Sequence, residues 1–310
     1  MAKKLHKTSI GGAAVMEGVM MRGPHSIAVA VRKPDGEIEI DVKETKPVSK
    51  RNFFLKLPIV RGCIAFFESM ITSTKALMYS ASFIDVEEEE PSKFDAWLEK
   101  VFGDKLKDAI LYLSVILSLF MSVGLFILLP TWLVSLVRIF CSNQVVLTVA
   151  EGVTRIVIFL GYLILVSQMP DIKRVFEYHG AEHKTIACYE SGEELTVENA
   201  KTKCRLHPRC GTSFLLIVMV VSIIVFSFLK WDNILIRTLT RLALLPIVAG
   251  ISYEIIKLAG RYDNFATRIV SWPGLMLQKI TTREPDDSQL EVAIASMKAV
   301  IPENKDEDKW

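Results

Sequence analysis

Two short clusters hold most of the residues that could bind a metal ion. The first, "YHGAEH" at 178–183, places His179, Glu182 and His183 at i, i+3 and i+4. On a helix these positions share one face, so two imidazoles could grip one ion beside a carboxylate. The order H-x-x-E-H is the inverted form of the zinc-protease helix, in which the histidines bind zinc and the glutamate accepts a proton from water. The first cluster therefore predicts a helical metal site with Glu182 as general base.

The second cluster, "CRLHPRC" at 204–210, brings three further candidate ligands. Cys204, His207 and Cys210 lie three residues apart around a proline. Short Cys/His spacing in a turning backbone is typical of zinc ligands. We expect His207 to complete the site of His179 and His183, while Cys204 and Cys210 shape the loop or bind a second ion. The alternative is a closed structural site, in which His179 or His183 joins both cysteines around one metal ion.

A glycine-rich stretch near the start is the third candidate. "SIGGAAVMEGVMMRGPH" at 9–25 contains Glu17, Arg22 and His25 among four glycines. It lacks the GxGxxG and GKS/T phosphate-binding patterns. A turned lead-in to the following strands is one interpretation of this stretch. A role in orienting substrate through Glu17, Arg22 and His25 is the other.

Composition indicates that these clusters belong to a membrane protein. Of 310 residues, 51% are hydrophobic, and the net charge of +2 gives no argument for nucleic acid as a partner. Roughly 20 apolar residues cross a bilayer. Four stretches meet this criterion approximately, and we predict four spans, at 109–137, 145–169, 212–229 and 234–258.

The basic segments predict the orientation of the spans. Lysine and arginine are concentrated before the first span, between the second and third, and after the fourth, and such charge marks the cytoplasmic side. We therefore expect both termini and the loop at 170–211, which carries both metal clusters, to face the cytoplasm. Glu151 and Arg155, at i,i+4 inside the second span, are expected to form a structural ion pair.

The expected architecture is mainly α, with a small N-terminal α+β part and a bundle of about four spans. Residues 26–42 alternate apolar and polar positions around Pro34-Asp35-Gly36, which predicts a β-hairpin. The region 1–84 would hold the glycine-rich loop, this hairpin and a long apolar helix at 57–82. An acidic linker at 85–93, the bundle at 94–282 with its loop at 170–211, and a polar tail at 283–310 with a short helix around 287–299 would follow.

Four ordered motifs carry a resemblance to a known family. "GGAAVMEGVMMRGP", "YHGAEHKTIACYE", "CRLHPRCGTSF" and "ISYEIIKLAGR" together resemble an uncharacterised bacterial membrane-protein family, the YqhQ type. The resemblance implies a multi-pass protein of the bacterial inner membrane, labelled a predicted metal-dependent enzyme. It supplies no substrate. A zinc-dependent hydrolase is the leading hypothesis, and a scaffold or membrane-protein biogenesis factor with a structural metal is the alternative.

Overall fold

The computed structural model describes residues 6–45, 53–84, 106–137, 139–140, 143–229, 234–262, 264–304 and 306–310. These residues fall into two compact units, one formed by residues up to 84 together with 162–310, and the other by 85–161. The predicted acidic linker at 85–93 lies outside the described residues. Each unit is considered by itself.

A four-stranded antiparallel sheet in the order β1-β2-β3-β4 forms the centre of the first unit. Its strands are β1 (Gly11–Val15), β2 (Gly18–Arg22), β3 (Ser26–Arg32) and β4 (Ile38–Glu44). The predicted hairpin is confirmed, since β3 and β4 pair from Arg32↔Ile38 outward around the Pro34-Asp35-Gly36 turn.

The glycine-rich stretch differs from the expected turned lead-in. It forms a second hairpin, β1–β2, which pairs from Gly11↔Arg22 to Val15↔Gly18 and places Glu17 in its turn at φ 49°. Glycine and alanine have low strand propensity, so the sequence signal was weak. Pairing with β3 and packing of the buried β2 residues compensate for that weakness.

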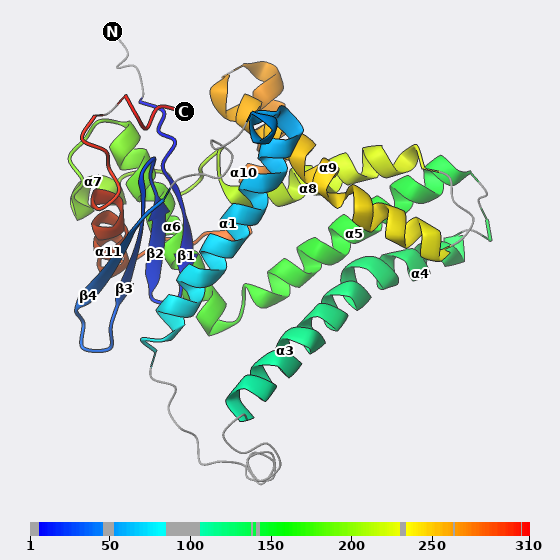
Figure 1. Cartoon of the computed structure of the whole chain (residues 1–310), viewed down its shortest axis with the longest axis horizontal. Helices are drawn as coiled ribbons and strands as arrows, with labels where there is room; N and C mark the ends of the chain where they lie inside the picture. Colours follow the sequence, from blue (N-terminus) through cyan, green and yellow to red (C-terminus); the bar gives the residue numbers. More distant parts are fainter. Residues whose placement is uncertain are drawn as a thin grey trace. The chain divides into compact units, whose positions relative to one another are not determined.

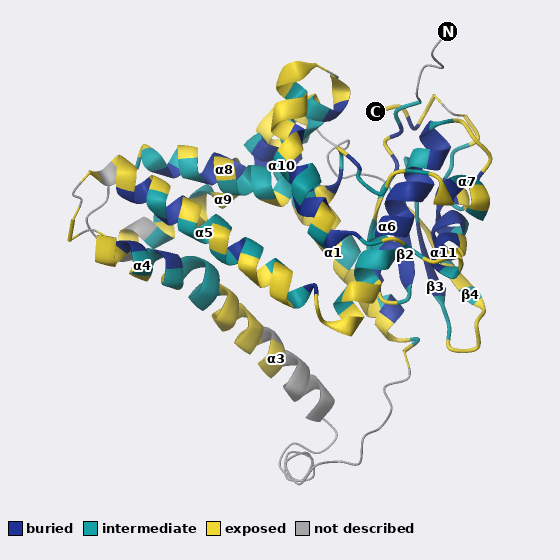
Figure 2. Cartoon of the chain, turned by 180° about the vertical axis from the view of Figure 1, so that it is seen from behind, coloured by how far each residue is buried: buried dark blue, intermediate teal, exposed yellow. Residues whose placement is uncertain are grey.

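Both faces of the sheet are covered within the first unit. Alternate residues of a strand point to opposite faces. Val19, Met21 and Ala28 belong to a core shared with α6 (Pro170–Glu190) and α11 (Asp287–Lys298). Val15, Met20, Val29 and Val31 instead pack with Ala76 of α1 (Pro58–Ala81). Figure 2 shows the buried positions gathered in the sheet, α6 and α11.

The C-terminal segment is more ordered than the expected polar tail. α11 begins at a capping box formed by Asp286 and Gln289, and its residues Leu290, Val292 and Met297 are fully buried. Thr8 forms an isolated bridge with Lys309, so the two ends of the chain meet. α11 and the following Val300 are therefore part of the core that includes α6.

Apolar helices complete the first unit. The short helices η2 (Phe54–Lys56) and α7 (Val197–Lys201) lie in its connections. Helices α8 (Gly211–Ser227), α9 (Ile234–Arg261) and α10 (Phe265–Thr281) pack on one another, and α1 packs along α9. The predicted long helix at 57–82 is thus confirmed as α1. Its Arg61 forms a two-pronged ion pair with Glu254 of α9.

The second unit consists of apolar helices. It contains α3 (Leu106–Val123), the π-helical turn η4 (Gly124–Leu128), α4 (Leu129–Val137) and most of α5 (Gln144–Val166). Many of its large apolar side chains are exposed, among them Leu119, Phe120 and Met121, which is typical of a surface that faces lipid. The predicted ion pair is present, with Arg155 Nη2 3.2 Å from Glu151 Oε1.

Three helical segments in the described residues are long and apolar enough to cross a membrane. They are Ile116–Val137, Val145–Val166 and Thr238–Arg261, which match the first, second and fourth predicted spans. The predicted third span corresponds to α8, which is apolar but only 17 residues long. A count of four spans is therefore not confirmed.

Candidate metal centre

The C-terminal half of α6 is unusually polar for a buried helix. From Tyr178 to Glu190 nearly every residue is buried, including Glu182, His183 and Lys184. Burial of polar groups is unfavourable unless they find partners, so each of these side chains is expected to have a hydrogen-bonding partner or a ligand. The helix starts at Pro170, a residue suited to the first helical turn, and runs without interruption through the motif.

Gly180 allows another segment of the chain to cross α6 in close contact. A Cβ at this position would lie 1.9 Å from the carbonyl oxygen of Arg283. The crossing segment is fixed by the backbone N–H of Arg283, which donates to the carbonyl of Phe176 at 2.8 Å. Gly180 is therefore required by packing, although glycine lowers intrinsic helix propensity by about 1 kcal/mol relative to alanine.

The same crossing orients His179. Its Nδ1 lies 2.8 Å from the carbonyl oxygen of Thr281. Because a carbonyl only accepts, Nδ1 carries the proton, and Nε2 is the atom available for a metal. This arrangement, in which the second ring nitrogen donates to a backbone carbonyl, is the usual support of a metal-binding histidine.

His183 has the same support from a different segment. Its Nδ1 donates to the carbonyl oxygen of Arg205 at 2.6 Å, and the residue is 1% exposed. Its Nε2 makes no hydrogen bond with any described residue. The rings of His179 and His183 lie 4.4 Å apart between centroids, as expected for one helix face. Because Nδ1 carries the proton, Nε2 is an acceptor buried without a donor, and its lone pair is available to a metal.

Cys210 is the third member of the cluster. It caps the N-terminus of α8, where its Sγ accepts from the N–H of Thr212, and it lies 3.3 Å from Nε2 of His179. Ligand atoms of His179, His183 and Cys210 all lie within 4.8 Å of one another. Two ligands of one zinc ion, each at about 2.0–2.3 Å, are roughly 3–4 Å apart. The three side chains could therefore hold one metal ion if they move slightly toward it.

The electrostatics of the cluster favour a thiolate. Burial raises the pKa of Cys210, but the adjacent imidazoles of His179 and His183 outweigh burial and bring that pKa well below its ordinary value. Burial lowers the pKa of His179, whereas the Cys210 thiolate raises it, to a net value of about 9. A thiolate is the form of cysteine that binds metals, and metal binding would release the imidazole proton.

Glu182 lines the same cavity as His183 and Cys210 and interacts electrostatically with both histidines. It is 4% exposed, and its Oε2 has no hydrogen-bond partner in the described part of the chain. The backbone N–H of Gly12 faces its carboxyl group, and a Cβ at Gly12 would lie 3.2 Å from the Glu182 carboxyl carbon. Burial raises the pKa of Glu182, opposed by the two neighbouring histidines. Such a shift suits a group that accepts and returns a proton.

These groups open onto a cavity of about 230 Å³. Its wall includes Glu182, His183 and Cys210, the backbone of β1 at Gly11 and Gly12, and Arg22. Concave sites with a few convergent polar groups are where ligands bind. The glycine-rich stretch therefore contributes its backbone and one of its three predicted side chains to the cavity.

The other two predicted residues of the glycine-rich stretch lie elsewhere. Glu17 forms an ion pair with Arg174 and accepts from the Tyr178 hydroxyl. His25 lies on the surface, 2.7 Å from Glu307. Neither lines the cavity. Arg22 does, and it also lies 3.3 Å from Glu68 of α1.

His207 and Cys204 are not part of the three-residue cluster. The His207 ring is 5.6 Å from that of His183 between centroids, and its Nε2 faces Arg209 at 3.2 Å and Glu190 at 3.8 Å. Burial lowers the pKa of His207. Cys204 is exposed, and its Sγ accepts from the N–H of Leu206. The structure thus brings Cys210 to the position where the sequence predicted His207.

A buried ion pair beside the cavity was not predicted. Arg209 pairs with Glu190, and both side chains are 5% exposed. Glu190 also accepts from the backbone N–H of Thr8 at 2.8 Å, and Arg209 stacks on the ring of Trp310, 5.4 Å from its centroid. The pair joins α6, the second cluster and both ends of the chain. Sequence spacing gives no signal for such a long-range contact.

Comparison with known proteins identifies the family of this chain. The family model described as "Protein of unknown function (DUF1385)" matches residues 57–303. The chain belongs to this family. "Uncharacterized protein YqhQ" of Bacillus subtilis (strain 168) is 36% identical over 302 residues, which are 97% of this chain and 95% of that protein. No solved structure matches the chain. The DUF1385 match includes α6, the second cluster and the apolar helices α8 and α9.

Proposed function

We propose that this DUF1385 protein is a membrane-embedded zinc hydrolase. His179, His183 and Cys210 would hold the metal, and Glu182 would be the general base. The observation that supports this proposal is the convergence of three ligand atoms beside an unpartnered, buried carboxylate oxygen. Three protein ligands with a position left open are characteristic of catalytic zinc, whereas structural zinc has four. Imidazole and thiolate together favour zinc over harder ions.

Each protein group has a defined role in the proposed reaction. Zinc supplies Lewis acidity that polarises a substrate oxygen and acidifies water. Oε2 of Glu182 takes a proton from the attacking water, whose oxygen forms a bond to the acyl or phosphoryl centre. Glu182 then returns that proton to the leaving group as the bond to it breaks. Because burial raises its pKa, the carboxyl group can serve in both directions.

The fold also supports four membrane crossings. The sheet, α6 and α11 form one core, so they lie on the same side of any membrane. The chain must then cross an even number of times between β4 and α6, and again between α6 and α11. Two candidate spans lie in the first interval, but among the described residues of the second only α9 qualifies. α8, about 25 Å long at 1.5 Å per residue, is the helix available for the missing crossing.

The basic segments favour the cytoplasm as the side of this shared core. The connection between α5 and α8 contains seven lysines and arginines, and such charge marks the cytoplasmic face. We therefore propose that the metal centre and both termini are cytoplasmic, in the inner membrane of a bacterium.

Replacement of Glu182 by glutamine tests the catalytic role. Zinc-loaded protein in detergent would be assayed on p-nitrophenyl esters of carboxylic and phosphoric acids. We expect Glu182→Gln to keep its zinc and to lose about 10²–10⁴-fold in kcat. Asp41→Asn on the surface strand β4 is the matched control and should retain activity. Full activity of Glu182→Gln, or no hydrolysis by the zinc-loaded wild type, would contradict the proposal and favour a structural metal.

A further inference from the structure

An apolar groove of about 560 Å³ adjoins the polar cavity of the metal centre. It lies between α1, α8 and α9, which pack together in the first unit (Figure 1). Its floor and walls are formed mainly by apolar side chains, including Phe66, Leu215 and Ile256. Small residues of α1, at Ala65, Ser69 and Ser73, are spaced four apart and therefore line one side of it. A volume of this size is within the range of small-molecule sites.

The groove and the metal cavity share a wall. Ser69, Arg209, Gly211 and Trp310 line both of them. Arg209 is 5% exposed, and its Nε has no hydrogen-bond partner among the residues described. A buried guanidinium N–H without a partner at this junction is suited to an oxygen of a ligand. One ligand could thus place an apolar part in the groove and an oxygen-bearing part beside Arg209, Glu182 and the metal ligands.

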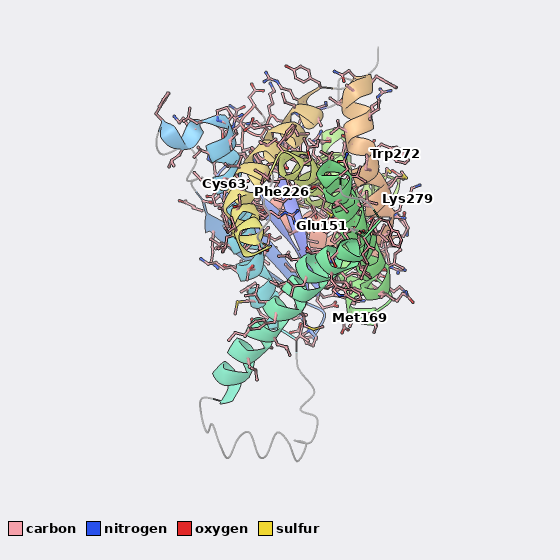
Figure 3. All side chains as sticks on the ribbon, turned by 90° about the vertical axis from the view of Figure 1, so that its right-hand side faces the viewer. Cys63, Glu151, Met169, Phe226, Trp272 and Lys279 are labelled. Carbon is pink, nitrogen blue, oxygen red and sulfur yellow. The ribbon has the colours of Figure 1, made fainter. Side chains whose placement is uncertain are left out.

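The groove lies at the end of the membrane helices where lipid headgroups would be. Its residues come from the N-terminal turns of α8 and from the C-terminal part of the candidate span Thr238–Arg261, at Tyr253 and Ile256. The neighbouring helix α10 exposes Phe265, Ile269 and Trp272. Figure 3 labels Trp272 and Lys279 on this helix. Exposed aromatic and basic side chains of this kind collect at the membrane–water interface.

We propose that the substrate of this site is a fatty-acyl amphiphile that enters from the bilayer. Its hydrocarbon chain would occupy the groove between α1, α8 and α9, and its carbonyl or anionic head would reach the cavity through the junction at Arg209. That this amphiphile is a substrate rests on the proposed hydrolase, whereas binding of its hydrocarbon chain in the groove does not. Burial of successive methylene groups in the groove provides the affinity.

Photo-crosslinking of the full-length protein in detergent tests this inference. The probe is a diazirine-labelled sixteen-carbon fatty acid, and the attachment sites are found by peptide mass spectrometry. We expect crosslinks in α1 between 65 and 77 and in α8 at 214–215. Ser69→Trp fills the shared wall and should lower labelling by at least about tenfold, because several methylene groups lose their burial. Ser69 is exposed, so the larger side chain does not have to enter a packed core.

Ile71→Trp is the matched control, since Ile71 is on the same helix, is 55% exposed and does not line the groove. It should label as the wild type does. Crosslinks outside the groove, or labelling that Ser69→Trp leaves unchanged, would overturn the inference. The same assay on His183→Ala separates the two proposals: labelling retained in this variant after it has lost its metal supports the groove alone. Wild-type protein that binds metal but shows no labelling of the groove supports the hydrolase alone.

Discussion

Nε2 of His179 lies 3.3 Å from Sγ of Cys210, although 31 residues separate them in the chain. The histidine is held on α6 by the segment that crosses at Gly180, and the cysteine is held as the N-cap of α8. Their meeting joins the soluble core to the first turn of an apolar helix. A metal bound between them would therefore couple the position of α8 to the packing of α6.

Gly180→Ala should destabilise the fold and damage the metal site. The added methyl group would meet the Arg283 carbonyl at 1.9 Å, which forces the crossing segment and the Thr281 carbonyl away from α6. We expect a loss of about 1–3 kcal/mol in the free energy of unfolding. Gly161→Ala is the matched control, because no atom lies within 4 Å of its Cβ position. That variant should be neutral or more stable. Thermal unfolding in detergent compares them, and equal behaviour of the two variants would argue against the close crossing.

Removal of Glu190 should leave Arg209 as an uncompensated buried charge. Glu190→Ala is expected to cost about 3–5 kcal/mol of stability. The control is Glu193→Ala, which disturbs the more exposed contact with Lys203 and should cost about 0–1 kcal/mol. Denaturant titrations of both variants provide the measurement. A small effect of Glu190→Ala would mean that water reaches Arg209.

The stability of α11 should depend on the ionised N-cap at Asp286. Partial burial raises the pKa of Asp286, but hydrogen bonds from Ser288 and from the N–H of Gln289 give a net lowering. A carboxylate with a lowered folded-state pKa stabilises the fold above its unfolded pKa, and this contribution is lost as the pH falls through the folded value.

The corresponding experiment compares Asp286→Ala with Asp286→Ser across pH. At neutral pH the alanine variant should lose about 1 kcal/mol, while serine, also a good N-cap, keeps most of the stability. The difference between wild type and alanine should shrink below about pH 4, where the aspartate protonates. A difference that is constant with pH would show that the charge is not involved.

Local patterns in the sequence predicted several elements and named His179, His183 and Cys210 among five candidate metal ligands. Alternation around Pro34-Asp35-Gly36 predicted the β3–β4 hairpin, and apolar length predicted three candidate spans. Spacing of four residues placed His179 and His183 on one helix face, as the ring contact shows. Each of these features depends on residues close together in sequence, where period and turn chemistry are decisive.

The features that were missed depend on distant contacts. Cys210, and not His207, is the third residue of the cluster because α8 begins directly after Cys210, beside α6. The residue spacing around Pro208 does not determine where that helix begins. The β1–β2 hairpin has low intrinsic strand propensity and gains its stability from β3 and α6. The helix α11 was predicted around 287–299, but its burial was not, because Leu290, Ala293 and Met297 enter a core formed with the distant α6.

Metal content of the purified wild type, Cys210→Ser and Cys204→Ser tests the central claim most directly. The two substitutions are chemically identical and lie in one short segment, but only Cys210 belongs to the cluster, while Cys204 is exposed. By inductively coupled plasma mass spectrometry, we expect one zinc ion per chain in the wild type and in Cys204→Ser. We expect most of this zinc to be lost in Cys210→Ser, as in His183→Ala. Wild-type protein that takes up no zinc would contradict the proposed metal centre. Zinc that is retained in Cys210→Ser but lost in Cys204→Ser would contradict it as well.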